Sequence, residues 1–275
     1  MTTEWLFSLS PFFTMALLAS TSASIPSGII GSYVVVKRIV FISGSIAHSV
    51  LGGIGIALYL RETYALAWLK PIYGALLAAI LAAAAIGSIR LYYRQREDTV
   101  IAALWALGMS VGVIFISLTP SYTPELIDYL FGNILWTSKA NLYTLLGLDV
   151  LILVITFFFH SRFLAICFDE EQAILQNQPV KSLYFLLLSL IAITVVILIQ
   201  VVGAILLIAI LSLPAAIANT YTKNLPKMMS LATLLSIAVS TLGLTLSWFS
   251  NWPSGATIAL TITTVYLANL IRRKG

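Results

Sequence analysis

The chain has 275 residues, of which 60% are hydrophobic and only 9% are charged, and its mean hydropathy is +1.02. So much apolar surface exceeds what an ordinary globular core buries, which excludes a soluble domain and predicts an all-helical, multi-pass integral membrane protein in contact with lipid. The formal net charge of +5 raises nucleic acid as a partner. The basic residues, however, stand in short groups at the ends of apolar runs, which indicates a membrane protein and no nucleic-acid binding.

Apolar runs of about the 20 residues needed to cross a bilayer predict nine transmembrane helices. Eight crossings remain the alternative, because residues 183–213 contain no charged side chain and could form one long tilted helix. The first 36 residues contain no Lys or Arg, so we expect no cleaved signal peptide. The expected spans are 11–36, 41–60, 71–93, 99–119, 140–160, 183–202, 203–222, 228–249 and 253–271.

Basic residues orient these helices through the positive-inside rule. With nine crossings and the N-terminus outside, only Arg61, Lys70 and Lys139 of the 15 Lys and Arg residues fall outside, which leaves 12 inside. Merging 183–222 into one crossing would move Lys223, Lys227 and the basic C-terminus outside, so nine crossings are favoured. We therefore expect an external N-terminus and a cytoplasmic C-terminus.

Two segments between spans are long enough to form structure of their own. Residues 120–138 are expected outside, where Pro120 and Pro124 end the preceding helix and Tyr and Trp side chains suit the membrane interface. A short helix along the outer surface is the expected structure there. Residues 161–182 are expected on the cytoplasmic side.

The cytoplasmic segment contains the signals of one short, separate helix. Asp169 can cap its start, Gln172 follows three residues later, and Glu170 and Glu171 place negative charge in the first turn, where the helix dipole favours it. Asn177 tolerates the left-handed conformation that ends a helix. A helix of about two turns is marginal alone in water, so we expect it to dock against a partner or against its own membrane domain.

His48 is the most informative residue of the chain, because residues 41–58 contain no other ionisable side chain. Ionisable groups inside membrane spans are costly and usually face a protein interior or an aqueous path, so a functional role is the first hypothesis. Helical spacing places Gly44, His48, Gly52, Gly55 and Tyr59 on one stripe, where small residues let another backbone or a solute come close. The alternative is a histidine that only hydrogen-bonds to a neighbouring helix.

Asp149 follows the same logic in the fifth span, with a hydrogen-bonded structural carboxylate as its alternative. Enzyme motifs are missing: the chain contains no phosphate-binding loop, no His-Glu-x-x-His and no Gly-x-Ser-x-Gly. The sequence therefore predicts a transporter and no enzyme.

Six sequence pieces, in their order and spacing, resemble one family over nearly the whole length of the chain. They are Gly31-Ser-Tyr-Val-Val-Val-Lys-Arg38, Ser45-Ile-Ala-His-Ser-Val-Leu-Gly-Gly53, Leu130-Phe-Gly-Asn-Ile-Leu135, Phe168-Asp-Glu-Glu-Gln-Ala173 with Pro179-Val180, Leu213-Pro-Ala-Ala-Ile-Ala218 and Pro253-Ser-Gly-Ala256. The chain resembles the membrane permeases of ABC importers for zinc, manganese and iron.

This resemblance implies a single transmembrane permease domain over 1–275, with the fold of a type II ABC importer, in a bacterial inner membrane. It implies two cytoplasmic ATPase subunits, an extracytoplasmic metal-binding protein and a second permease subunit that is identical or paralogous. No cofactor is expected to stay bound; the metal is cargo, and ATP acts on the partner subunit. The segment that matches 168–180 docks into the ATPase in this family, which points to Phe168, Asp169, Glu170, Glu171, Ala173, Gln176 and Asn177.

One departure from the family concerns the metal pathway. Relatives usually carry an aspartate one turn before the histidine, and Gly44 stands at that position here. We expect Asp149, or hydroxyls such as that of Ser45, to supply the oxygen ligands instead. Alternatively, the chain passes a cation that tolerates nitrogen ligands, as zinc does. Gly44, Gly52, Gly55 and Pro214 are assigned to helix packing.

Three other functions remain as alternatives. An ion-coupled secondary transporter would show inverted repeats and several intramembrane carboxylates. A permease for cobalamin or siderophores would be longer and lack the histidine, and the third alternative is a membrane scaffold without transport.

Overall fold

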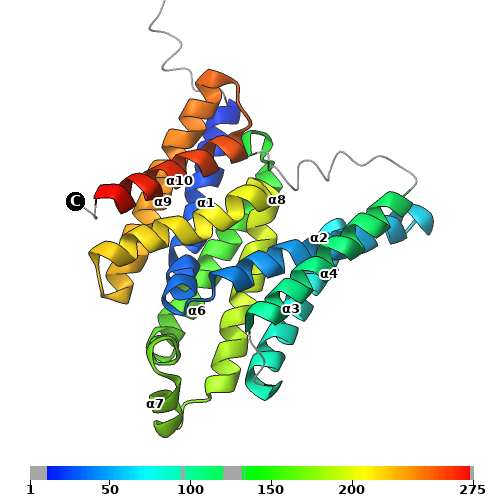
Figure 1. Cartoon of the computed structure of the whole chain (residues 1–275). Coiled ribbons are helices and arrows are strands. Elements are labelled where there is room, and N and C mark those ends of the chain that lie inside the picture. The colour runs from blue at the N-terminus through cyan, green and yellow to red at the C-terminus, as the bar shows by residue number, and fades with distance from the viewer. Residues whose placement is uncertain (1–10, 94–96, 120–131, 133, 273–275) are drawn as a thin grey trace, which may run out of the picture. The chain divides into compact units, whose positions relative to one another are not determined.

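The computed structural model describes residues 11–93, 97–119, 132 and 134–272, and the described chain is helical. Figure 1 shows these helices along the chain. Their bounds are α1 Pro11–Val36, α2 Val40–Thr63, α3 Pro71–Ser88, the π-helical turn η2 Ile89–Tyr93, α4 Glu97–Leu118, the 3-10 turn η3 Ile134–Trp136, α6 Lys139–Phe168, α7 Glu170–Leu175, α8 Val180–Tyr221, α9 Leu225–Ser250 and α10 Ser254–Arg272.

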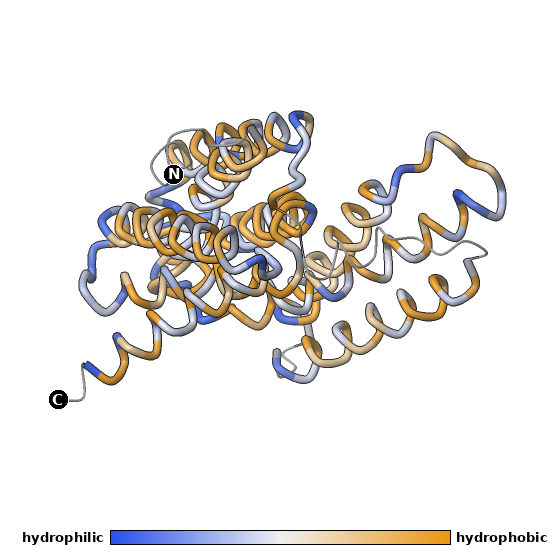
Figure 2. The backbone as a smooth tube through the Cα atoms, turned by 90° about the horizontal axis from the view of Figure 1, so that it is seen from above, coloured by the Kyte–Doolittle hydropathy of each residue, from blue (hydrophilic) through white to orange (hydrophobic). Residues whose placement is uncertain are grey.

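Eight helices of the described chain are long and apolar enough to cross a membrane. Figure 2 shows apolar residues along the long helices, whereas hydrophilic residues gather mainly at helix ends and in connections. This pattern confirms the predicted multi-pass, all-helical membrane fold. The surface helix expected within 120–138 lies mostly outside the described residues, which include only η3 and its neighbours there.

The number of crossings depends on α8, which is 42 residues long, about twice the length that one crossing needs. Its helical geometry breaks at Gly203, whose φ of 76° and ψ of 166° suit glycine. This is the boundary predicted between the sixth and seventh spans. Gly203 lies beside Gly132 of the segment expected outside, and Tyr221 donates a 2.5 Å hydrogen bond to Asn269, which is expected near the inner side. Residues 204–221 therefore form a helical segment separate from 180–202, as nine crossings require, and the choice between eight and nine crossings stays a prediction.

The chain forms two compact units, each assembled from distant parts of the sequence. The first unit comprises Met1–Ser32, Ile127–Val154 and Ile197–Gly275, and the second comprises Tyr33–Leu126 and Ile155–Val196. In the first unit α9 packs on α10, where Gly243 lies against the backbone of Ile258. In the second unit α2 packs on both α3 and α4.

Candidate functional site

Glycines let α2 lie unusually close to both of its neighbours in the second unit. A Cβ added at Gly52 would stand 2.9 Å from the Gly108 carbonyl oxygen, and one at Gly55 would stand 2.7 Å from the Gly112 carbonyl oxygen. The other side of α2 meets α3, where a Cβ on Gly53 would stand 2.1 Å from the carbonyl oxygen of Gly74. Small residues at membrane helix interfaces permit such backbone approach. The α2–α3 and α2–α4 contacts therefore fix the helix that contains His48.

His48 lies on the side of α2 that faces α4. Its imidazole stacks on the indole of Trp105, with ring centroids 4.1 Å apart and an interplanar angle of 19°. The side chain is half-buried, and within the described chain neither ring nitrogen has a hydrogen-bond partner. A flat stack of this kind holds the ring plane while leaving the ring edge, which bears the nitrogens, available to a ligand. Neutral imidazole nitrogen is a common metal ligand.

The two residues one helical turn before His48, Gly44 and Ser45, offer few side-chain oxygens as metal ligands beside the imidazole. Gly44 is buried and has no side chain to offer. Ser45 is fully buried, and its hydroxyl donates a 3.1 Å hydrogen bond to the Ile101 carbonyl on α4. The Ser45 oxygen keeps lone pairs, but its hydrogen is committed to α4.

Asp149 is a buried carboxylate on α6 in the first unit. The residue is 4% exposed, and its Oδ2 accepts a 2.5 Å hydrogen bond from the Ser22 hydroxyl of α1. Its Oδ1 has no hydrogen-bond partner among the described residues. A buried unpaired carboxylate oxygen calls for a partner, such as a cation, a proton or water. His48 and Ser45 belong to the second unit, so the joint use of the three residues stays a prediction.

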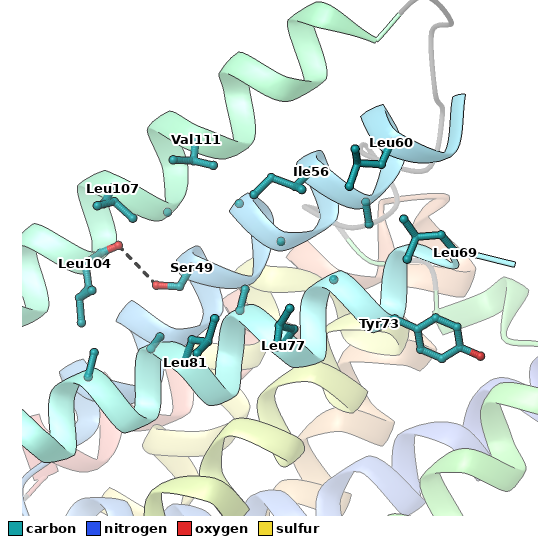
Figure 3. A pocket seen from close by; sticks show the side chains of 18 residues that line it. Ser49, Ile56, Leu60, Leu69, Tyr73, Leu77, Leu81, Leu104, Leu107 and Val111 are labelled. Carbon is teal, nitrogen blue, oxygen red and sulfur yellow. Dashed lines mark hydrogen bonds between the residues drawn. The ribbon is translucent and has the colours of Figure 1, made fainter. Parts of the chain in front are cut away.

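An apolar groove of about 450 Å³ runs along α2, α3 and α4 (Figure 3). Glycine, alanine and leucine residues form most of its wall, and none of its lining residues carries a charge. Its serine, Ser49, points its hydroxyl toward the Leu104 carbonyl, 3.4 Å away (Figure 3). Divalent cations favour carboxylate, imidazole or thiolate ligands, and the groove offers only the hydroxyls of Ser49 and Tyr73, so it is not the candidate metal site.

The short helix predicted in the cytoplasmic segment is confirmed as α7. Asp169 caps it by accepting a 2.9 Å hydrogen bond from the Gln172 backbone N–H, and Asn177 follows it in the left-handed conformation with a φ of 56°. Ala173 is buried, whereas Phe168, Ile174 and Leu175 are 64%, 59% and 83% exposed. Exposed apolar side chains within one short segment, next to charged and amide side chains, are typical of a protein-binding surface, and we call Phe168, Ile174 and Leu175 the apolar cluster of this segment.

The site residues predicted at α7 therefore have different surroundings. Glu171, Gln176 and Asn177 are exposed beside the apolar cluster, whereas Ala173 packs inward. Glu170 turns to the chain's own basic residues, accepting hydrogen bonds from Lys37 and Arg90.

Sequence reasoning missed three residues of these surfaces, namely Trp105, Ile174 and Leu175. A signal for the first was present, because Gly108 and Gly112 form a small-residue pair at the spacing of a helix-packing face, one turn after Trp105. For Ile174 and Leu175 the signal was two apolar residues beside a charged helix start, in a segment expected outside the membrane.

A profile of the ABC 3 transport family matches residues 10–273, nearly the whole chain. The chain belongs to the ABC 3 transport family. Membership and the eight apolar helices together identify a multi-pass membrane permease of ABC type.

Known proteins are similar to it over most of their length. A probable metal transport system membrane protein of Chlamydia muridarum is 45% identical over 96% of this chain and 90% of the relative. A manganese transport system membrane protein, MntC, of Listeria monocytogenes is 30% identical over 93% of this chain and 88% of the relative. The solved structure of PsaBC from Streptococcus pneumoniae in complex with Fab superposes with a TM-score of 0.84 at 28% identity, covering 98% of this chain and 95% of that one.

Proposed function

We propose that the chain is the transmembrane permease subunit of an ATP-driven importer of divalent metal cations. Relatives of this ABC 3 protein are named metal or manganese transport proteins, which supports a metal as cargo and makes manganese the first metal to test. The cation passes from an extracytoplasmic binding protein, through two permease subunits, to the cytoplasm. The chain itself is non-catalytic, because the ATPase is a separate subunit.

The exposed apolar cluster at α7 is the observation that carries this proposal. Three apolar side chains, Phe168, Ile174 and Leu175, are exposed in a segment that the basic-residue pattern predicts on the cytoplasmic side of the membrane, which we propose is a bacterial inner membrane. Exposed apolar side chains outside the lipid are typical of a protein-binding surface, so we propose that a protein partner covers them. A cytoplasmic ATPase that binds this cluster can drive the permease by moving α7.

His48 is the proposed ligand of the passing cation. Its ring is held by Trp105, its nitrogens are unpaired within the described chain, and it lies inside a membrane span. Asp149, with its unpaired Oδ1, is the proposed oxygen ligand, and Ser45 is the weaker candidate because its hydrogen is committed to Ile101. A permease site must release its ion, so a few ligands suffice while the binding protein selects the metal.

Reconstitution tests the proposal. The chain is placed in proteoliposomes with its ATPase and binding protein, and uptake of manganese, zinc and iron is measured with ATP, without ATP, and with an ATPase inactivated in its phosphate-binding loop. Uptake that requires hydrolysis supports the importer. Uptake by the chain alone, driven by a proton or sodium gradient, would establish the ion-coupled secondary carrier instead.

A further inference from the structure

Glu170 joins the short helix α7 to three other segments of the second unit. Its Oε1 accepts hydrogen bonds from Lys37 Nζ and from Arg90, the latter at 2.9 Å. Lys37 Nζ also donates to the Ile166 carbonyl in the last turn of α6. One carboxylate oxygen therefore connects the start of α7 with the end of α1, the end of α6 and the η2 turn. We call Lys37, Arg90 and Glu170 the inner clamp.

The inner clamp is partly shielded from solvent, which makes it stronger than an ordinary surface pair. The side chain of Lys37 is 7% exposed, that of Arg90 22% and that of Glu170 32%. The Arg90 guanidinium also lies 4.5 Å from the ring centroid of Tyr184, a buried residue of α8. Exposed pairs contribute little, whereas shielded, charge-assisted hydrogen bonds hold their partners in place.

The α7 helix depends on this clamp for its position. It has only six residues, too few to be stable alone, and Ala173 is its one buried side chain. Asp169 caps the helix locally, but Gln172, the donor of that bond, belongs to α7 itself. Among the described residues, the ion pairs of Glu170 are therefore the charged contacts that join α7 to the transmembrane helices.

Both basic residues of the clamp belong to segments that adjoin α2, the helix that contains His48. Lys37 is followed by Arg38, which has a φ of 61°, and by α2, which begins at Val40. His48 lies about 12 Å further along α2 at a rise of 1.5 Å per residue. Arg90 continues α3, whose Gly74 lies against Gly53 of α2. Glu170 is therefore connected to the start of α2 through Lys37 and, through Arg90 and the length of α3, to the side of α2.

The geometry points to Glu170 as the positioning residue that transmits movement of α7 to α2. This inference rests on the proposed function, since it assumes an ATPase that moves α7. Glu170 thereby has a different role from the apolar cluster of Phe168, Ile174 and Leu175. The cluster binds the ATPase, and the inner clamp transmits the movement of α7 to α2. The clamp lies between the two sites, and coupling through it is established only by variants that change the clamp and alter the transport ratio.

The test uses the full complex in proteoliposomes with manganese, and it measures ATPase association, ATP hydrolysis and metal uptake separately. For Glu170→Gln we expect normal association, hydrolysis within about twofold of wild type, and at least a tenfold loss of metal moved per ATP. Glu170→Asp, which keeps the charge, restores at least part of that ratio. Arg38→Gln is the matched control, because it removes the exposed basic neighbour of Lys37 and should leave the ratio unchanged.

Glu170→Gln also destabilises the fold, since the shielded Lys37 ammonium keeps the Ile166 carbonyl but loses its carboxylate partner. The double variant Lys37→Gln/Glu170→Gln removes both charges and keeps the test decisive, with the same tenfold loss expected. An unchanged ratio in the variants overturns the inference, as does a loss of ATPase association, which would place Glu170 in the docking surface. Failure of the proposed function is distinguishable, because then wild type itself shows no ATP-dependent uptake.

Discussion

Replacement of Gly53 by alanine tests whether backbone contact between α2 and α3 is required. The added Cβ would lie 2.1 Å from the Gly74 carbonyl oxygen and 2.6 Å from the Ala78 Cβ. Ordinary contact begins at 3.4 Å, so the two helices must separate locally by about 1.3 Å. Such overpacking costs about 1–3 kcal/mol. In a chain of this size that lowers Tm by about 2–4 °C for each kcal/mol.

Gly147 provides the matched control for this substitution. It lies within α6, and a Cβ added there meets nothing within 4 Å. Gly147→Ala should therefore keep or slightly raise Tm, because alanine favours a helix by about 0.5–1 kcal/mol over glycine. Thermal unfolding of both variants in the same detergent, with metal uptake measured alongside, decides the matter. Equal Tm values for Gly53→Ala and Gly147→Ala would refute the close α2–α3 contact.

Three further predictions concern the pathway and the apolar cluster. Asp149→Asn keeps an acceptor for Ser22, so Tm should stay within about 3 °C of wild type while uptake falls at least tenfold; unchanged uptake removes Asp149 from the pathway. Trp105→Ala removes a ring contact worth about 0.5–1.5 kcal/mol, so uptake should fall about 2- to 10-fold and Trp105→Phe should recover most of it; equal rates for both variants would mean that the stack does not orient His48. Leu175→Ala removes most of a side chain whose burial contributes about 1.5–3 kcal/mol, so the ATPase should bind about 10- to 100-fold more weakly in a titration. The control Leu260→Ala on α10 should bind the ATPase normally. The same affinity for both variants would show that the docking surface lies elsewhere.

Local features of the chain were predictable because each depends on neighbouring residues. The start of α7 at Asp169 and its end near Asn177 follow from capping chemistry, and both are confirmed. The break at Gly203 matches a boundary that the pattern of basic residues required. The stripe through His48, Gly52 and Gly55 also predicted a close backbone contact, which α4 provides.

Pairings between distant segments were not predictable, because no periodicity in one helix says which other helix covers it. Trp105 stacks on His48 from a different helix, and Ser22 bonds to Asp149 across the first unit. Glu170 is the clearest case, since its charge reads as a helix-start preference or a docking contact in sequence. Its two basic partners lie on other helices, and only the fold brings the three side chains together.

The central claim is that His48 binds the cation as it passes through the membrane. Its most direct test compares wild type, His48→Ala and His160→Ala in proteoliposomes with the ATPase and the binding protein, measuring manganese uptake at matched ATPase association. His160 is the other histidine of the chain and bonds to Tyr33 at 3.1 Å, which makes it the matched control. We expect His48→Ala to lose at least tenfold of its uptake while His160→Ala stays within about twofold of wild type, a difference of about 1 kcal/mol or more. Wild-type uptake by His48→Ala would contradict the claim and reduce this histidine to a packing residue.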